Sequence, residues 1–301
     1  MSRRLKAHVA VLAANILYGA NYSIAKVVMP KFIQPMGFIV IRVWVAALLF
    51  IVTAKLFVKE KIAVEDRLRL VLCAIFGITI NQLLFFKGLA LTSPIDSGLM
   101  MVTNPTFVMI LSAVFLSEII NARKIFGIIS GLSGAVLLIL FGQKYSNTGS
   151  SSLLGDLYIL INSLSYAIYI VLVKPLMKKY HPLTIMKIVF FIGAFLVLPF
   201  GFSEFKQIEW NTFTQSTWLA TIFVVVGTTF LAYLFNTLAL RELNAGTVSV
   251  YIYLQPLLAA GFAMILGKDS PNIIHFIAAI LIFFGVYLTV SRNKNDATTK
   301  A

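Results

Sequence analysis

The sequence has a single cysteine and no recognisable catalytic motif. Cys73 is alone among 301 residues, so no disulfide framework is available, and its expected role is that of a small packed residue. Zinc-ligand spacings and nucleophile elbows are absent, and the three histidines are too scattered to form a metal pair. We therefore predict no metal, no cofactor and no enzymatic activity.

Charged residues are also few, at 12% of the chain, whereas hydrophobic residues make up 59%. The mean hydropathy is +0.93. A soluble domain of this length could not cover so much apolar surface with so few polar side chains. The composition excludes a soluble globular protein and indicates that the lipid bilayer surrounds the chain.

Acidic residues are scarce, with 11 Asp and Glu against 25 Lys and Arg, and none lies at the centre of a long apolar run. Those nearest the runs lie at their ends: Asp96, Glu118, Asp156 and Asp269. For Glu118 and Asp269, capping or pairing is favoured over carrying protons. A proton-coupled antiporter normally needs a titratable group in its path. The sequence therefore gives proton coupling no support, although a histidine, a tyrosine or an acid at a helix end could still serve.

Ten apolar stretches have the length of transmembrane helices. A hydrocarbon core of about 30 Å needs roughly 20 apolar residues per helix, and the stretches are continuous rather than alternating, which excludes barrel strands. The predicted spans are His8–Val28, Gly37–Phe57, Leu70–Leu91, Ile95–Leu116, Ile125–Phe141, Leu154–Val173, Leu183–Phe200, Trp218–Leu240, Ala245–Leu266 and Ile273–Val290. The predicted fold class is an all-α integral membrane protein.

The net charge of +14 follows the predicted topology. Most Lys and Arg lie in the connections on the side of the N-terminus, whereas the opposite connections hold only Lys31, Lys144, Lys206 and Lys268. Because basic loops stay in the cytoplasm, both termini are predicted to be cytoplasmic. This distribution explains the charge without a nucleic-acid partner.

The ten spans fall into two sets of five with matching residues. Pro105 interrupts the fourth span and Pro256 the ninth, and the spacing from Pro105 to Gly134 equals that from Pro256 to Gly285. Because five is odd, the second set enters the membrane from the opposite side, as in inverted-repeat transporters. We predict one repeat over residues 1–145 and a second over 146–301, which includes a short polar cytoplasmic tail.

These motifs together resemble the EamA family of the drug/metabolite transporter superfamily. The residues that resemble the opening motif of the family are Tyr18-Gly19-Ala20-Asn21-Tyr22, followed by Lys26, Pro35 and Arg42. A later pattern of the family is matched by Pro105, Glu118, Gly127 and Gly134, and again in the second half by Pro256, Asp269 and Gly285. The resemblance covers essentially the whole chain. The second half of the sequence departs from the family pattern at two positions. Asp269 replaces the usual Glu, and Val189 stands at the position equivalent to Arg42 of the first half.

The resemblance implies a bacterial inner-membrane transporter of small metabolites, often amino acids, that does not hydrolyse ATP. It also implies a central cavity lined by helices 1, 3, 4, 6, 8 and 9. Polar residues of those spans agree with it, because amides in hydrocarbon are costly unless they are hydrogen-bonded. The predicted binding residues are Asn15, Asn81, Gln82, Asn104, Asn162 and Gln255, with Tyr18, Tyr166, Tyr251 and Tyr253 as walls. The alternative role is that of interhelical hydrogen bonds, worth about 0.6 kcal/mol each.

Two prolines and two bases complete the candidate site. Pro105 and Pro256 are predicted hinges, since a proline frees a backbone carbonyl that then needs protein or water as a partner; a plain kink explains them equally well. Arg42 and Lys87 either reach the cavity, where they would suit a carboxylate or phosphate, or extend to the interface. Both interpretations stay open.

The predicted function is that of a secondary transporter that moves a small polar metabolite, such as an amino acid or a related compound, by alternating access. A passive channel is the main alternative, and a membrane-embedded enzyme is a lesser one, because no clustered acids are seen. The predicted partners are the small-molecule substrate and the bilayer. Gly127 and Gly131 suit close helix packing, which we expect inside the chain rather than in a homodimer.

Overall fold

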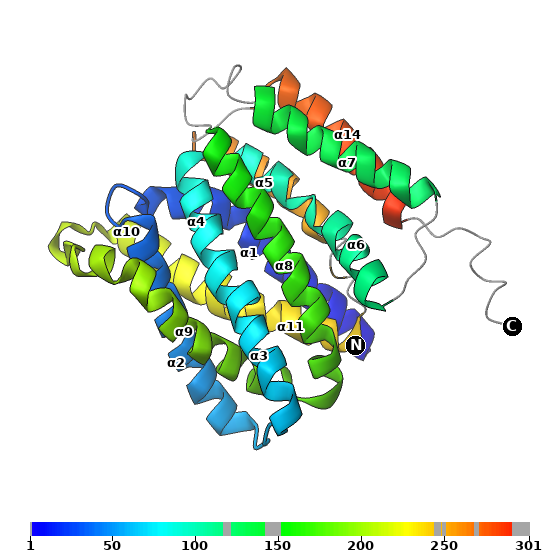
Figure 1. The fold of residues 1–301 in the computed structure, drawn as a ribbon. Coiled ribbons are helices and arrows are strands. Elements are labelled where there is room, and N and C mark those ends of the chain that lie inside the picture. Colours follow the sequence, from blue (N-terminus) through cyan, green and yellow to red (C-terminus); the bar gives the residue numbers. More distant parts are fainter. Residues whose placement is uncertain are drawn as a thin grey trace, which may run out of the picture.

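The computed structural model describes residues 2–116, 122–141, 152–243, 248, 251–267 and 271–290. All regular structure in these ranges is helical (Figure 1). A helix satisfies its backbone hydrogen bonds within one segment, which hydrocarbon requires. Glu118, Asp269 and the predicted boundary between the two repeats lie outside the described residues.

The first five spans contain one long helix each or a series of consecutive helical segments. They are α1 (Arg3–Val28), α2 (Pro35–Phe57), the series η1 (Val64–Asp66), α3 (Arg67–Ala74), η2 (Ile75–Ile80) and α4 (Asn81–Leu91), the pair α5 (Pro94–Met101) and α6 (Asn104–Leu116), and α7 (Ala122–Phe141). Proline at the first position of α2 and α5 favours the start of each helix.

The second half of the chain follows the same order. It contains α8 (Leu153–Lys179), α9 (Pro182–Lys206), η4 (Trp210–Thr212), the series α10 (Gln215–Ile222), η5 (Phe223–Leu231) and α11 (Ala232–Glu242), then η6 (Tyr251–Tyr253), α13 (Leu254–Ile265) and α14 (Ile273–Val290). Ser152 and Thr214 each accept a hydrogen bond from a backbone amide in the first turn of the helix that follows.

Seven helices within the described ranges are long and apolar enough to cross a membrane, and three shorter apolar helices accompany them. The seven are Arg3–Val28, Pro35–Phe57, Val64–Leu91, Pro94–Phe115, Leu153–Lys179, Pro182–Lys206 and Gln215–Glu242, and the shorter three are Ile125–Gly134, Tyr251–Ile265 and Ile273–Gly285. The structure thus confirms an all-helical fold with several membrane-spanning helices. The number of ten spans stays a prediction.

Equivalent helices of the two halves make equivalent contacts. Helix α1 packs against α11 and α13, and α8 packs against α4 and α6, while α2 pairs with α9 and α7 with α14. Figure 1 shows the α7–α14 pair side by side at one edge of the bundle. Each of α1 and α8 thus contacts helices of both halves, and their polar residues such as Asn15 and Asn162 are buried among these helices.

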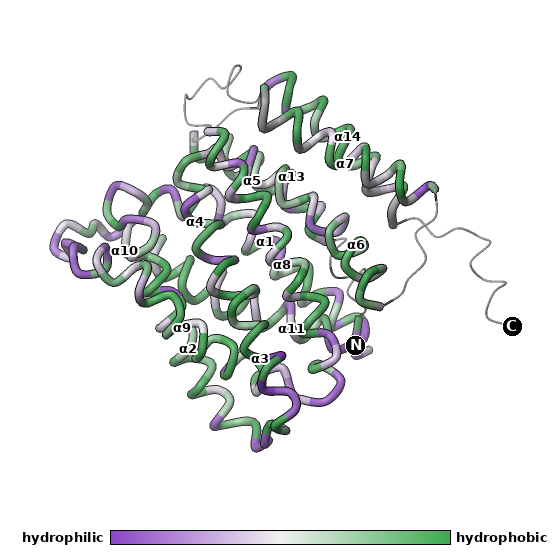
Figure 2. Tube along the Cα trace, viewed as in Figure 1, coloured by the Kyte–Doolittle hydropathy of each residue, from purple (hydrophilic) through white to green (hydrophobic). Residues whose placement is uncertain are grey.

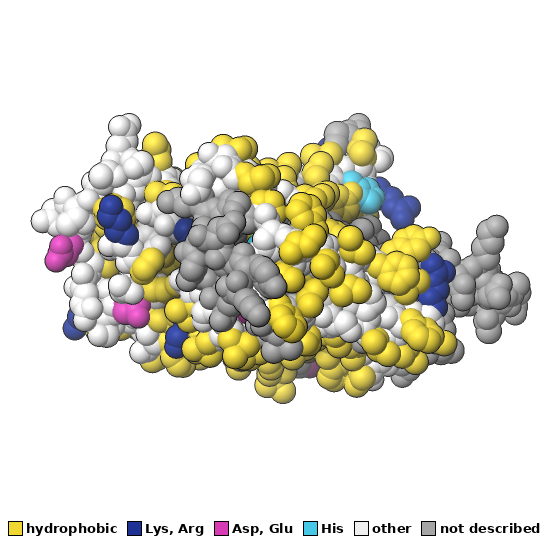
Figure 3. All heavy atoms as spheres, turned by 90° about the horizontal axis from the view of Figure 1, so that it is seen from above, with side chains coloured by type: hydrophobic (Ala, Val, Ile, Leu, Met, Phe, Trp, Pro, Cys, Tyr) yellow, Lys and Arg dark blue, Asp and Glu magenta, His cyan; other side chains and the backbone are white. Residues whose placement is uncertain are grey.

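The outer surface of the bundle is apolar. Figure 2 shows hydrophobic residues along most of each helix and hydrophilic residues mainly at the turns and chain ends, and in Figure 3 hydrophobic side chains cover much of the visible surface. Leu48, Val52, Phe195 and Ile280 are each more than half exposed. So many exposed apolar side chains are unfavourable in water and suit lipid contact.

Two spans contain π-helical segments at matching places. Segment η2 lies between α3 and α4, and η5 lies between α10 and α11. A π-helical turn inserts an extra residue and often marks a functional position. Here the two segments place Asn81 and Gln82, and in the other half Thr228 and Thr229, on the inner side of the bundle, where all four are buried.

Both predicted hinge prolines follow a break in the helix. The α-helix is interrupted at Val102 and Thr103, directly before Asn104 and Pro105, and the turn η6 precedes Pro256 in the other half. Each interruption lies against α1 or α8 rather than lipid, as freed backbone groups require. Their movement as hinges stays a prediction.

Glycine permits the closest contact between α7 and α14. A Cβ atom added to Gly285 would lie 2.5 Å from both the carbonyl oxygen of Gly127 and the amide nitrogen of Gly131. The two helices therefore approach backbone to backbone. Gly127 and Gly131 thus take part in packing within the chain, which the sequence favoured.

Candidate functional site

A cavity lined by polar, aromatic and aliphatic side chains lies between the helices near the centre of the bundle. Its volume is about 60 Å³, which holds a few water molecules, since one water needs roughly 10–15 Å³. The cavity is lined by Tyr18, Asn21, Tyr22, Arg42, Asn81, Gln82, Phe85, Phe86, Met101, Asn162, Tyr166, Thr228, Tyr233 and Gln255. Residues of both halves contribute, so any movement between the halves would change its shape.

On one side of the cavity, Gln255 of α13 is held by α1. Its Nε2 donates to Asn15 Oδ1 at 2.8 Å, and its Oε1 accepts from the Tyr22 hydroxyl at 2.8 Å. Asn15 in turn donates to the carbonyl oxygen of Val11 at 2.8 Å. Asn15 thus lies behind Gln255 and orients it, because it fixes which end of the amide is the donor.

On the opposite side, Tyr233 of α11 is the centre of a second network. Its hydroxyl accepts a hydrogen bond from Gln82 Nε2 at 2.6 Å and lies 3.1 Å from Asn81 Oδ1. Asn162 of α8 donates to the backbone carbonyl of Asn81 at 2.7 Å. Gln82 Oε1 and Asn162 Oδ1 have no hydrogen-bond partner among the described residues. Two amide oxygens that line the cavity are therefore available as acceptors.

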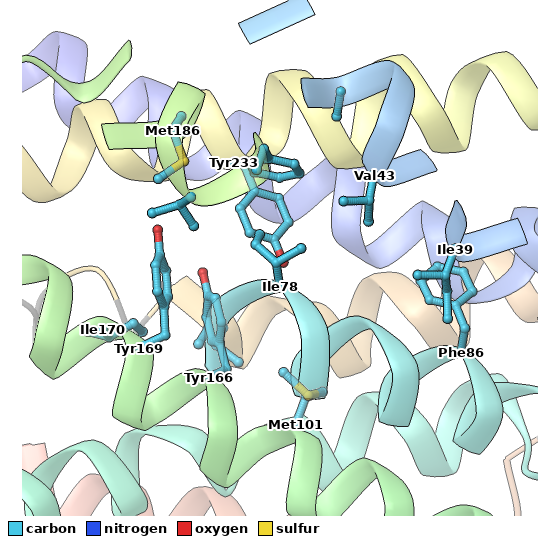
Figure 4. Packing of buried hydrophobic residues seen from close by; sticks show 14 of the residues in the cluster. Ile39, Val43, Ile78, Phe86, Met101, Tyr166, Tyr169, Ile170, Met186 and Tyr233 are labelled. Carbon is cyan, nitrogen blue, oxygen red and sulfur yellow. The ribbon is translucent and has the colours of Figure 1, made fainter. Parts of the chain in front are cut away.

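Aromatic rings separate this network from the core below it. Tyr166 stacks on Tyr169 with 5.7 Å between ring centroids, and Tyr18 meets Tyr233 edge to face at 6.3 Å. Figure 4 shows Tyr166 and Tyr169 extending from α8 towards Met186 and Tyr233. Asn236 donates to the Tyr166 hydroxyl at 2.6 Å, which fixes the ring at the cavity wall.

Arg42 is the one charged residue among the described residues that line the cavity, and it is 2% exposed. Its Nε and one terminal nitrogen donate to Thr229 Oγ1 at 2.9 and 2.7 Å, and the guanidinium lies 3.9 Å from the centroid of the Phe86 ring. The other terminal nitrogen, Nη1, has no hydrogen-bond partner in the part of the chain that the structure describes. A buried cation of this kind is costly without an anionic partner.

The structure brings seven of the predicted binding residues together at this cavity: Tyr18, Arg42, Asn81, Gln82, Asn162, Tyr166 and Gln255. For Arg42 it favours the interpretation in which the side chain reaches the cavity. Asn15 supports the site from behind.

Four other predicted binding residues lie away from the cavity. Asn104 donates to the backbone of Ser163 at 2.8 Å, which is a contact between α6 and α8. Lys87 is exposed and lies over the Tyr158 ring at 5.2 Å. Tyr251 contacts His8 at 2.9 Å, and Tyr253 packs edge to face on Phe283.

The prediction omitted several lining residues, notably Asn21, Tyr22, Thr228 and Tyr233. Helical spacing contained the signal for two of them. Asn21 and Tyr22 follow Tyr18 by three and four residues, so they lie on the same face of the helix. Tyr233 follows Thr228 by five, which an ordinary α-helix would place on a different face. The π-helical segment η5 moves it to the cavity.

Helices that span a membrane around a buried polar cavity define a multi-pass membrane protein with an internal site. The family model of the EamA-like transporter family matches residues 5–140 and again residues 153–291. The chain belongs to this family, and it is a membrane transporter. The two matched segments correspond to the two halves whose helices make equivalent contacts.

Relatives agree with the family assignment. The chain is 26% identical to the uncharacterized transporter YyaM of Bacillus subtilis, covering 96% of this chain and 94% of that protein. It is 25% identical to a WAT1-related protein of Arabidopsis thaliana, covering 96% of this chain and 82% of that one. A solved crystal structure superposes with a TM-score of 0.64 at 17% identity, covering 95% and 97% of the two chains, and shows that the fold is shared.

Proposed function

We propose that the protein is a secondary transporter with ten transmembrane helices in two inverted repeats, over residues 1–145 and 146–301, which works by alternating access. The matched helix interruptions and the equivalent helix contacts of the two halves support it. The distribution of Lys and Arg supports cytoplasmic termini, and the resemblance supports a bacterial inner membrane. Substrate would bind in the cavity while one repeat moves against the other.

The substrate we propose is a small metabolite with a carboxylate, such as an amino acid. One observation carries this assignment: Arg42 is buried at the cavity with one free guanidinium nitrogen and no acidic residue among the described lining residues. A substrate carboxylate would supply the missing anionic partner through charge-assisted hydrogen bonds. The unpartnered oxygens of Gln82 and Asn162 would accept from a substrate ammonium group.

The cavity in this conformation is smaller than the roughly 300–1,000 Å³ that is typical of ligand pockets. Substrate therefore binds in a more open conformation of the proposed cycle. A passive channel would need a continuous open path instead. Proteoliposomes distinguish the two, because only a carrier shows saturation and counterflow.

The test uses matched pairs of compounds on the full-length purified protein. Thermal shifts are measured with a panel of amino acids and with the corresponding amino acid amides, which lack only the carboxylate charge. The best ligand is then followed by uptake into proteoliposomes. A shift with the amide equal to that with the acid would contradict the assignment.

Replacing Arg42→Gln should weaken binding of the acid by at least about thirtyfold, because loss of one partner of a buried charge pair costs about 2 kcal/mol or more. The control is Lys87→Gln, which removes an exposed base from a site away from the cavity. Equal loss in both variants would indicate a general charge effect rather than a binding site.

A further inference from the structure

A second cluster of buried titratable groups lies outside the substrate cavity. It occupies the end of the bundle where α1 and α4 finish and where α5, α8 and α14 begin. Asp96, Asp156 and His275 are 1%, 0% and 5% exposed. Neither the cavity nor the proposed substrate contacts use any of them.

Asp96 has partners on both carboxylate oxygens. His275 Nε2 lies 2.9 Å from Oδ1, and the Ser93 hydroxyl donates to Oδ2 at 3.0 Å. His275 Nδ1 accepts from the backbone amide of Asn272 at 3.0 Å, so the ring proton is on Nε2 and is donated to Asp96. Both carboxylate oxygens of Asp96 therefore accept a hydrogen bond.

Asp156 differs, because only one of its oxygens is satisfied. Oδ1 accepts a hydrogen bond from the Thr92 hydroxyl, whereas Oδ2 has no partner among the described residues and the side chain is fully buried. Its place in the first turn of α8 favours the anion slightly. That effect is small beside the loss of hydration of an ionised carboxylate.

Among the described residues, no charged side chain donates a hydrogen bond to the second oxygen of Asp156. Lys26 of α1 donates to the backbone carbonyl of Thr92 at 2.5 Å, and it is the hydroxyl of that threonine that contacts Asp156. Lys87 of α4 is exposed and contacts Tyr158. Asp96 is the second acid of the cluster, and two carboxylates in one buried cluster repel each other when both are ionised.

We propose that Asp156, with Asp96 and His275 beside it, is a proton-binding site whose occupancy holds this end of the bundle closed. When the end is open, water reaches Asp156 and stabilises its anion, and the proton is released to that water. Closing the end expels the water, and Asp156 takes up one proton from it. This inference rests on the proposed alternating access.

The position of the cluster links it to movement between the halves. Thr92 and Asp96 belong to the first family match, over residues 5–140, and Asp156 and His275 belong to the second, over 153–291. Separation of the halves at this end would break both the Thr92–Asp156 and the Asp96–His275 contacts. The cluster is therefore assembled only when this end is closed.

Infrared spectroscopy on the full-length protein in lipid tests proton occupancy without any substrate. The wild type should show the carbonyl stretch of a buried protonated carboxyl group, and Asp156→Asn should lose it. Asp66→Asn is the control, since Asp66 accepts from Lys179 at 3.0 Å and Tyr180 at 2.8 Å at the other end of α8. An identical band in the wild type and Asp156→Asn would overturn the proposal.

Thiol labelling tests the link to opening. In a Cys73→Ala background, Ser97→Cys places a thiol at a fully buried position beside Asp96, and Ser216→Cys places one at the exposed start of α10. The ratio of their labelling rates cancels the pH dependence of the reagent. The labelling rate of the Ser97→Cys variant divided by that of the Ser216→Cys variant should rise with pH. The rise should be at most about tenfold per pH unit, which is the limit for the release of one proton per opening event.

When Asp156→Asn is added to both labelling variants, the same ratio should stay low at every pH, because asparagine imitates the neutral acid. A ratio that is independent of pH while Asp156 is intact would overturn the proposal. An equal pH dependence with and without the Asp156→Asn substitution would overturn it as well. Neither measurement needs a substrate, so failure of the amino acid assignment through Arg42 would leave both results interpretable.

Discussion

At the scale of single residues, two amides that look alike in the sequence have different surroundings. Asn104 and Gln255 each precede a proline at the equivalent place in the two halves. Gln255 lines the cavity, where it is held by Asn15 and Tyr22, whereas Asn104 donates to the backbone of Ser163 and lies away from the cavity. The two halves thus differ in their polar chemistry, and one amide serves the site while the other serves packing.

Alanine substitutions should separate these two roles. Gln255→Ala should lower ligand affinity, because it removes a group that lines the cavity, and should also lower the melting temperature without ligand, because its bonds to Asn15 and Tyr22 are lost. Asn104→Ala should lower the melting temperature, since an interhelical hydrogen bond in a membrane protein contributes about 0.6 kcal/mol, and leave affinity unchanged. Thermal denaturation with and without the best ligand measures both. Ligand affinity that is lost in Asn104→Ala and kept in Gln255→Ala would contradict the assignment of the cavity as the binding site.

Whether the sequence can predict a site residue depends on how far apart in the sequence the contacting residues lie. Tyr18, Asn81 and Asn162 could be predicted because a polar group inside an apolar span must face protein. The pair of Asp96 and His275 could not, because 179 positions separate the two residues and only the packing of α5 against α14 brings them together. Viewed alone, Asp96 is an acid in the first turn of a helix, and it does contact the N-cap of α5, because its carboxylate accepts a hydrogen bond from the Ser93 hydroxyl.

At the scale of elements, the contact between α7 and α14 depends on glycine. Gly285→Ala should destabilise the α7–α14 pair, because the new Cβ would lie 2.5 Å from backbone atoms of Gly127 and Gly131, and backbone cannot move aside as a side chain can. Overpacking of this kind costs about 1–3 kcal/mol, which should appear as a lower melting temperature.

Gly261→Ala is the matched control for that substitution. It adds the same methyl group to helix α13 at a position where nothing lies within 4 Å of the new Cβ. Equal destabilisation by both substitutions would show that helix propensity or lipid contact, and not the backbone contact with α7, decides the effect.

The elements themselves could be predicted only in part. Long apolar runs predict helices well, because hydrocarbon leaves no other structure for a single segment. The π-helical segments η2 and η5 gave no signal in the apolar pattern, since they lie inside long hydrophobic runs such as Phe223–Leu231, where Thr228 and Thr229 are the only polar side chains. The shift of helical face that they produce explains why Tyr233 was not predicted to line the cavity.

At the scale of the whole molecule, the prediction of an inverted repeat depends on each half having an odd number of membrane spans. If each half has five spans, the connection between α2 and α3 and its equivalent between α9 and α10 face opposite sides of the membrane. The described helices agree in order and in contacts. Sidedness is a separate property, because two halves with equivalent contacts still require a membrane to define inside and outside.

Labelling in intact cells would decide the sidedness. In the Cys73→Ala background, Lys59→Cys lies on the exposed connection after α2, and Ser216→Cys lies at the exposed start of α10, after the connection from α9. A membrane-impermeant maleimide should label the thiol of the Ser216→Cys variant in intact cells and that of Lys59→Cys only after the cells are opened, because five predicted spans separate the two positions and the more basic connection stays in the cytoplasm. Labelling of both variants in intact cells, or of neither, would place the two connections on one side. The halves would then be parallel, and a carrier that alternates by the exchange of two inverted repeats would be excluded.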